Sequence, residues 1–195
     1  MTSPMLRFAL CLAPILSLSP LGALHAAPQA LPYDCAMAAQ AIGAPVDEME
    51  PAPDQGWQLG QDEARLVCSW YTKPAAKAAG GQVLNREDYK DVGTLSAQLV
   101  IYGDPLRRAD AEMMNAAHDL PPELDIAGAW LFSLKPLNMD GKLGILPPEI
   151  MSDSLGVSVA YANSFATTTG TGSALTTGWS VAAAARILTA ATAAR

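Results

Sequence analysis

Two stretches of the chain alternate apolar with polar side chains at the period of a β-strand, residues 66–71 and 95–102. Because successive side chains of a strand point to opposite faces, Leu66, Cys68 and Trp70 share one face of the first stretch. The second stretch turns its polar side chains outward and four apolar ones toward a core: Leu95, Ala97, Leu99 and Ile101. We expect the two strands to pair antiparallel across a long connection.

Residues 155–161 show the cleanest alternation, with large side chains on one face and small ones on the other. The small residues predict that another element packs closely against their face, most simply a helix backbone. The Ala-rich segment from Trp179 to about Ala194 fits that role, because it carries an apolar stripe at helical spacing. We therefore expect the last helix to cover the small side of this strand.

Capping residues predict two further helices. Asp34 is a good N-cap for a helix over 35–42, and Gly43 follows its last turn. Asp104 followed by proline predicts a second helix over 105–119, which the next prolines stop.

Turn residues divide the rest of the chain. The apolar runs 129–135 and 142–146 flank Asp140-Gly141, which predicts a β-hairpin. The Pro-rich, acidic stretch 45–60 is predicted to be a loop, and 73–81 a flexible connector. Together these elements predict a single α+β domain. It would hold a mostly antiparallel sheet of about 4–6 strands with three helices packed on it, in the order helix-strand-strand-helix-strands-helix.

The N-terminus has the parts of a secretory signal peptide. Arg7 precedes an apolar run over 8–18, and small residues end the segment at Ala26. The run is shorter than the about 20 residues that span a bilayer, and an uncleaved anchor is the alternative interpretation. We predict a signal peptide over 1–26, a mature domain over 27–195, and a periplasmic or secreted location.

Charge narrows the expected partners. Removal of Arg7 takes the formal net charge from −7 to −8. An acidic chain with scattered cations matches neither nucleic acid nor anionic lipid, but it would suit a basic protein partner. No stretch after the signal peptide is apolar enough to span a membrane.

Cysteine count predicts a covalent link. Once Cys11 leaves with the signal peptide, Cys35 and Cys68 remain. An even number of cysteines in an oxidising compartment predicts a disulfide, here between the first helix and the first strand. Two free thiols or a pair of metal ligands are the alternative. A metal would need further Cys or His ligands, however, and His118 is the only histidine of the predicted mature chain. We expect no metal and no cofactor.

Candidate catalytic groups are few. Asp119 follows His118, but adjacent helical side chains point in different directions, so a histidine that suits a helix C-terminus is the simpler interpretation. The acids of 45–60 lack the spacing of an EF-hand calcium loop. A paired-carboxylate hydrolase would draw on acids in stretches expected to be exposed: Asp47, Glu48, Glu87, Asp88 and Asp91. We therefore favour a function without catalysis.

Two function classes remain. One is binding of a small ligand or a protein partner, and the other is a structural, assembly or inhibitor (immunity-type) role in the cell envelope. A binding surface would use tryptophans, each of which could instead pack in the core. Beside them would lie the Thr- and Gly-rich segment 163–178, which could bind an anion at the N-terminus of the last helix or could be a flexible hairpin or loop that Thr177 caps. The candidate surface residues are Trp57, Trp130, Trp179, Thr171, Gly172 and Thr177.

The order of elements, with Cys35, Cys68 and Trp70 in a Cys…Cys-Ser-Trp pattern, resembles a family of small, uncharacterised envelope proteins best known from actinobacteria. In that family a Cys-initiated first helix and an Ala-rich C-terminal helix pack on an antiparallel sheet with a Cys-x-Trp strand. The resemblance implies an α+β fold and a place in the cell envelope, and it supplies no catalytic residues.

Overall fold

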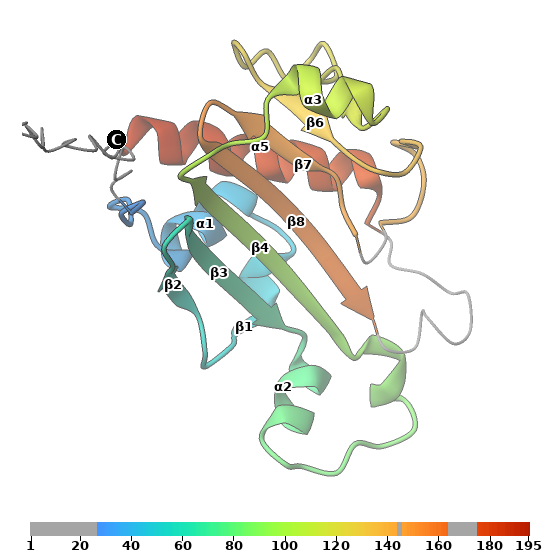
Figure 1. The fold of residues 1–195 in the computed structure, drawn as a ribbon. Helices are drawn as coiled ribbons and strands as arrows, with labels where there is room; N and C mark the ends of the chain where they lie inside the picture. Colours follow the sequence, from blue (N-terminus) through green and yellow to red (C-terminus); the bar gives the residue numbers. More distant parts are fainter. Residues whose placement is uncertain (1–26, 144–145, 164–174) are drawn as a thin grey trace, which may run out of the picture.

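The computed structural model describes residues 27–143, 146–163 and 175–195. In these residues one antiparallel sheet of eight strands has helices on both of its faces (Figure 1). The strands are β1 (Glu50–Pro51), β2 (Gly56–Leu59), β3 (Glu63–Tyr71), β4 (Gly93–Tyr102), β5 (Ala117–His118), β6 (Trp130–Phe132), β7 (Glu149–Ser152) and β8 (Leu155–Asn163). The α-helices are α1 (Cys35–Ile42), α2 (Lys73–Ala79), α3 (Arg108–Met113) and α5 (Thr177–Ala193), and short 3₁₀ helices span Val46–Glu48 and Asp88–Asp91.

Three long strands form the middle of the sheet. The strand order is β1-β3-β4-β8-β7-β6-β5, and β2 also pairs with β3. In the register of the central strands, Leu66 lies beside Leu99, and Leu99 beside Val157. The predicted antiparallel pairing of 66–71 with 95–102 is therefore confirmed, and the α+β class with it.

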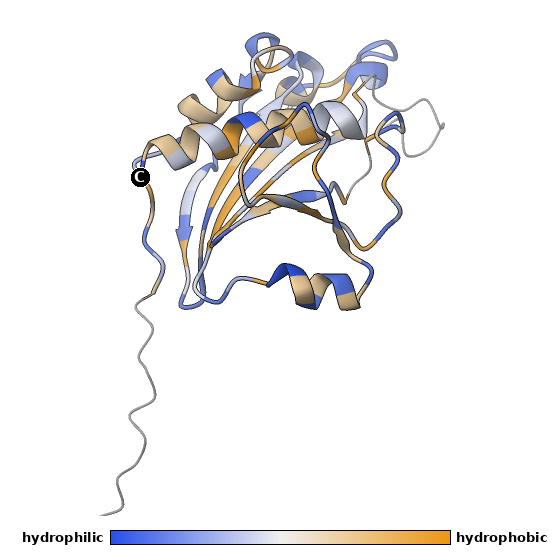
Figure 2. Ribbon diagram, turned by 90° about the horizontal axis from the view of Figure 1, so that it is seen from above, coloured by the Kyte–Doolittle hydropathy of each residue, from blue (hydrophilic) through white to orange (hydrophobic). Residues whose placement is uncertain are grey.

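The main core lies between the sheet and the helices α1 and α5. The strands are most hydrophobic beside these helices (Figure 2). The predicted inward residues of β3 and β4 are buried there: Leu66, Cys68, Trp70, Leu95, Ala97, Leu99 and Ile101. Arg186 of α5 donates from Nε to the carbonyl oxygen of Ala41 at 2.7 Å, which joins α5 to the end of α1.

The prediction that the last helix covers the small side of β8 is wrong. Leu155, Val157 and Val159 are buried in the core that α5 completes, and the smaller side chains lie on the other face. Burying the large side chains removes more apolar area from water, and the alanines of α5 provide the close approach from the helix side. The hydroxyl of Ser180 on α5 donates to the carbonyl oxygen of Val159.

A second, smaller cluster lies on the opposite face of the sheet. Ala111 of α3 packs there with Trp130 of β6 and Met151 of β7. The ring of Trp130 meets that of Phe132 edge to face, with centroids 6.3 Å apart. Helix α3 therefore covers only one end of this face.

Several boundaries differ from the predictions. The helix expected over 105–119 is α3 alone, because the chain turns at Asn115, where φ is 54°, and then enters β5. The connector expected over 73–81 contains α2, whose N-cap Thr72 accepts from the amide of Ala75. The stretch 45–60, expected to be a loop, contains β1 and β2.

The hairpin expected between 129–135 and 142–146 is also wrong. Strand β6 pairs with β7 instead, and Lys142 forms an isolated bridge with Thr176. The described residues thus hold eight strands and four α-helices, more than the 4–6 strands and three helices expected.

Cys35 of α1 and Cys68 of β3 meet as expected. Their sulfur atoms lie 2.01 Å apart, at disulfide distance. The predicted signal peptide over 1–26 lies outside the described residues, and none of the described helices has the length and apolar character needed to cross a membrane.

Candidate functional site

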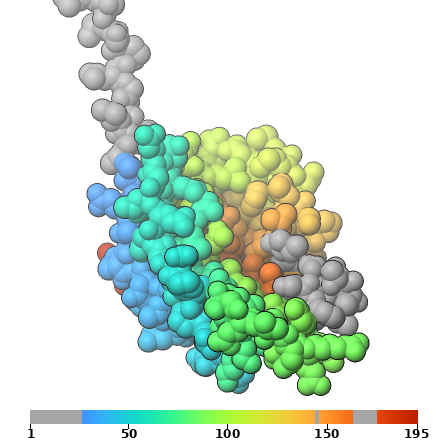
Figure 3. Space-filling model, turned by 90° about the horizontal axis from the view of Figure 1, so that it is seen from below, coloured from blue at the N-terminus to red at the C-terminus, as the bar shows by residue number. Residues whose placement is uncertain are grey.

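A pocket opens on the sheet face that points away from α1 and α5. We call it the open-face pocket, and its cavity volume is ≈ 320 Å³. In the space-filling view the surface is hollowed between the teal and bright-green segments and the yellow to orange ones (Figure 3). The lining residues are Ser96, Gln98, Phe132, Ser133, Leu134, Lys135, Leu146, Pro147, Glu149, Ser158 and Ala160.

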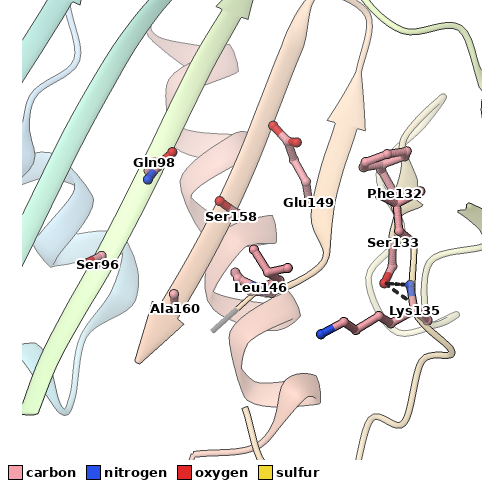
Figure 4. A pocket seen from close by; sticks show the side chains of 11 residues that line it. Ser96, Gln98, Phe132, Ser133, Lys135, Leu146, Glu149, Ser158 and Ala160 are labelled. Carbon is pink, nitrogen blue, oxygen red and sulfur yellow. Dashed lines mark hydrogen bonds between the residues drawn. The ribbon is translucent and has the colours of Figure 1, made fainter. Parts of the chain in front are cut away.

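Two central strands form the floor of the pocket. Gln98 of β4 lies beside Ser158 of β8, and Ser96 lies beside Ala160. Because these side chains alternate with the buried residues of the same strands, they all point to the face that the long helix leaves uncovered (Figure 4). The small side of β8, expected to face a helix, is thus part of a cavity.

Glu149 enters the pocket from the start of β7. The hydroxyl of Tyr102 donates to its Oε1 at 2.9 Å. Burial raises the pKa of this carboxyl, while the bond from Tyr102 and the nearby charge of Arg65 lower it. Burial first, and then the charge of Glu149, also raise the pKa of the Tyr102 hydroxyl.

Gly156 makes this arrangement possible. A Cβ atom at this position would collide with Oε1 of Glu149 and with the ring of Tyr102. Tyr102 and Glu149 are 47 residues apart in the chain, and they meet across β8, where a glycine leaves the room.

Arg65 is already paired beside this group. Its guanidinium donates from Nη2 to Oε1 of Glu63 at 2.7 Å and from Nη1 to Oε1 of Gln98 at 3.2 Å. The Glu63–Arg65 pair is about one-third exposed on each side, so water screens it. Arg65 makes no ion pair with Glu149 among the described residues.

The outer wall of the pocket is apolar apart from one cation. Leu134 is 74% exposed and Leu146 is 72% exposed. Lys135 is exposed too, and its side chain extends into the space beside Leu146 (Figure 4). The Ser133 hydroxyl holds this turn, because it donates to the carbonyl oxygen of Lys135 at 2.9 Å and accepts from its amide at 3.3 Å.

These groups can form hydrogen bonds and ion pairs with a ligand. The lining provides neutral hydrogen-bonding groups, one carboxylate and one ammonium, next to apolar side chains. A glycosidase-type mechanism uses two facing carboxyl groups, and Glu149 is the only acid among the described residues of the lining. Within the described part of the chain, no three His, Cys, Asp or Glu side chains gather as a metal site would require.

The tryptophans predicted as a surface lie in different places. Trp57 of β2 is half-buried against the main core, and its Nε1 donates to the carbonyl oxygen of Tyr33 at 2.8 Å. Trp179 of α5 also packs on that core, whereas Trp130 is 5% exposed under α3. None of these three tryptophans is among the described residues that line the open-face pocket.

The predicted cap of the last helix is shifted by one residue. Thr176, and not Thr177, accepts from the amide of Trp179 at 3.1 Å. Thr177 is the first residue of α5, and its hydroxyl lies 3.4 Å from the carbonyl oxygen of Gly141. Thr171 and Gly172 lie outside the described residues.

The carboxylates considered for hydrolysis do not come together. Asp47 and Glu48 lie in the first 3₁₀ helix, while Glu87, Asp88 and Asp91 lie at the second.

His118 is in β5 rather than in a helix, and its Nε2 lies 3.3 Å from the carbonyl oxygen of Ser133. Asp119 instead pairs with Arg108 at 2.6 Å. His118 and Asp119 are therefore not arranged as a catalytic pair.

Glu149 and Tyr102 are not among the site residues that the sequence predicts. The only local signal is a glycine among the small residues of β8, and by itself that pattern predicts a surface for a helix. A single glutamate after two prolines carries no mark of burial. Its surroundings come from strands far away in the sequence.

Comparison with known proteins adds no relative: neither the protein-family models, nor the curated proteins, nor the solved structures include a match to this chain.

Proposed function

We propose that this chain is an exported, non-catalytic binding protein that takes up a small ligand in the open-face pocket. The observation that carries the proposal is the pocket itself: polar groups from three strands line it, and two exposed leucines form part of its wall. Small-molecule sites combine apolar surface with a few placed polar groups in this way.

Export is part of the proposal. The sulfur atoms of Cys35 and Cys68 are at bonding distance, and structural disulfides persist in oxidising compartments. The N-terminal pattern around Arg7 supports the same location.

An envelope assembly or inhibitor role is the alternative. A protein partner would cover Leu134 and Leu146, but it would not need the polar floor formed by β4 and β8. A hydrolase is less well supported, because Glu149 has no second carboxylate opposite it in the lining.

The test compares two tryptophan variants on one strand. Ala160 lines the pocket, and Ala162 is exposed on the same face of β8 outside the lining. The full chain is screened by ligand-observed NMR against a mixture of amino acids, dipeptides, sugars and nucleosides. We expect at least one component to bind, Ala160→Trp to weaken it by about tenfold or more, and Ala162→Trp to leave it unchanged. Equal binding by both variants, or no binding at all, would contradict the proposal.

A further inference from the structure

We propose that the ligand is a compact zwitterion with an apolar side chain, an apolar α-amino acid or a dipeptide. Its ammonium group would bind Glu149, and its carboxylate would lie toward Lys135. This inference rests on the proposed function of the open-face pocket and specifies its ligand.

The inner end of the pocket calls for a cation. Oε1 of Glu149 accepts from Tyr102, and its other carboxylate oxygen has no hydrogen-bond partner among the described residues. Arg65, the cation whose field reaches it, is bonded to Glu63 and Gln98. A partly buried carboxylate without a paired cation is unfavourable, and an ammonium donor would form a charge-assisted hydrogen bond with it.

The other end of the pocket calls for an anion. Lys135 forms no ion pair with any residue in the ranges described, and the turn around Ser133 fixes its backbone. Figure 4 shows the carboxylate of Glu149 and the ammonium of Lys135 well apart, with Leu146 between them. Opposite charges separated along one pocket match a zwitterion. A dipeptide carries its two charges at opposite ends, whereas a single amino acid carries both on one carbon and would meet both groups only through the reach of the Lys135 side chain.

The wall between these charges is apolar. Leu134 and Leu146 expose about three-quarters of their surface, 74% and 72%, and Phe132 and Pro147 lie beside them in the lining. A ligand with an apolar side chain would cover this surface. A sugar would leave the leucines uncovered, and a nucleotide would bring two or more negative charges to a pocket with one cation.

The size of the cavity agrees with this class. Its volume of ≈ 320 Å³ is at the lower end of the about 300–1,000 Å³ found for small-molecule sites. A longer peptide would extend beyond the lining, so the ligand has one or two residues.

The test measures affinity by calorimetry for four probes: leucine, the dipeptide Leu-Phe, N-acetyl-leucine and leucine amide. The unmodified chain should bind leucine, Leu-Phe or both, and the tighter of the two identifies the source of the zwitterion. Acetylation removes the ammonium charge, so N-acetyl-leucine should bind about tenfold or more weakly than leucine.

Two variants assign the contacts. Glu149→Gln keeps an acceptor for Tyr102 but removes the charge. It should therefore lower the affinity for leucine about tenfold and leave the affinity for N-acetyl-leucine unchanged. Lys135→Met should lower the affinity for leucine and leave the affinity for leucine amide unchanged. The loss should be only about two- to fivefold, because the lysine is exposed. Glu123→Gln and Lys73→Met remove the same charges from exposed sites elsewhere and should change nothing.

Three outcomes would overturn the inference: N-acetyl-leucine binding as well as leucine, full affinity in Glu149→Gln, or no binding of any amino acid or dipeptide. If a sugar or nucleoside binds instead and Ala160→Trp blocks that binding, the assignment of the ligand as a zwitterion is wrong, while the proposed function stands. If nothing in the mixture binds, both fail.

Discussion

Gly156 leaves the space in which the carboxylate of Glu149 lies against Tyr102. The hydroxyl of Tyr102 donates to Oε1 of Glu149 at 2.9 Å, and a Cβ atom on Gly156 would overlap both side chains. One glycine near the start of a long strand thus decides whether the carboxylate of Glu149 can lie over the open face of the sheet.

Gly156→Ala should destabilise the protein. The new methyl group forces Glu149 or Tyr102 away, and such overpacking typically lowers the free energy of unfolding by about 1–3 kcal/mol. Urea denaturation measures this loss in the free energy of unfolding. Removing the Glu149 side chain in the same background, as Gly156→Ala/Glu149→Ala, should recover part of the loss.

Gly80→Ala is the matched control for that substitution. Its Cβ would lie 3.5 Å from the nearest backbone oxygens, an ordinary contact, and its φ of −78° suits any residue. The free energy of unfolding of Gly80→Ala should stay within about 1 kcal/mol of that of the unmodified protein. Similar losses in both variants would show that Gly156 has no special role.

Glu149 should make stability depend on pH. Burial raises the pKa of this carboxyl in the folded protein above the ordinary value of 4.5. Between the unfolded and folded pKa values the folded state binds more protons, so stability falls as the pH rises through that interval. The groups that act on Glu149 are Tyr102, Arg65 and Glu63.

Glu149→Gln isolates this effect. Relative to the variant, the unmodified protein should lose stability as the pH is raised above the ordinary glutamate pKa of 4.5, as measured by urea denaturation at each pH. A difference that does not change with pH, or that has the opposite sign, would show that burial does not control this group.

The link between Cys35 and Cys68 should contribute strongly to stability. The two residues are 33 positions apart. Closing a loop of that size lowers the entropy of the unfolded chain and so raises the free energy of unfolding by about 3–4 kcal/mol. Cys35→Ala/Cys68→Ala should therefore unfold at a much lower urea concentration than the oxidised protein. Unchanged stability would argue against a bond between them.

Ser180→Ala tests the contact between α5 and β8. The Ser180 hydroxyl is buried and donates to the carbonyl oxygen of Val159, so its loss leaves a buried acceptor unsatisfied and should lower the free energy of unfolding by about 1–3 kcal/mol. Thr189 is exposed, and among the described residues its hydroxyl bonds only within its own helix, to the carbonyl oxygen of Ala185. Thr189→Ala should change stability by less than about 0.5 kcal/mol, and a larger loss there than at Ser180 would refute the contact.

Local pattern alone determined much of the fold. The period-2 alternation of 66–71 and 95–102 predicted which side chains of β3 and β4 are buried, because a strand facing a core must place its apolar residues on one side. The capping residue Asp34 predicted α1, the Ala-rich C-terminal stripe predicted α5, and the two remaining cysteines predicted the link of α1 to the sheet.

Only the tertiary structure decided which face of β8 is covered and where the pocket lies. The alternation of β8 shows two distinct faces. Helix α5 packs on the face with the large side chains, because that packing buries more apolar area. The meeting of Tyr102 with Glu149, and the pairing of β6 with β7, depend on strands that are distant in sequence. Their registers bring a glutamate over a glycine, and no local pattern encodes that contact.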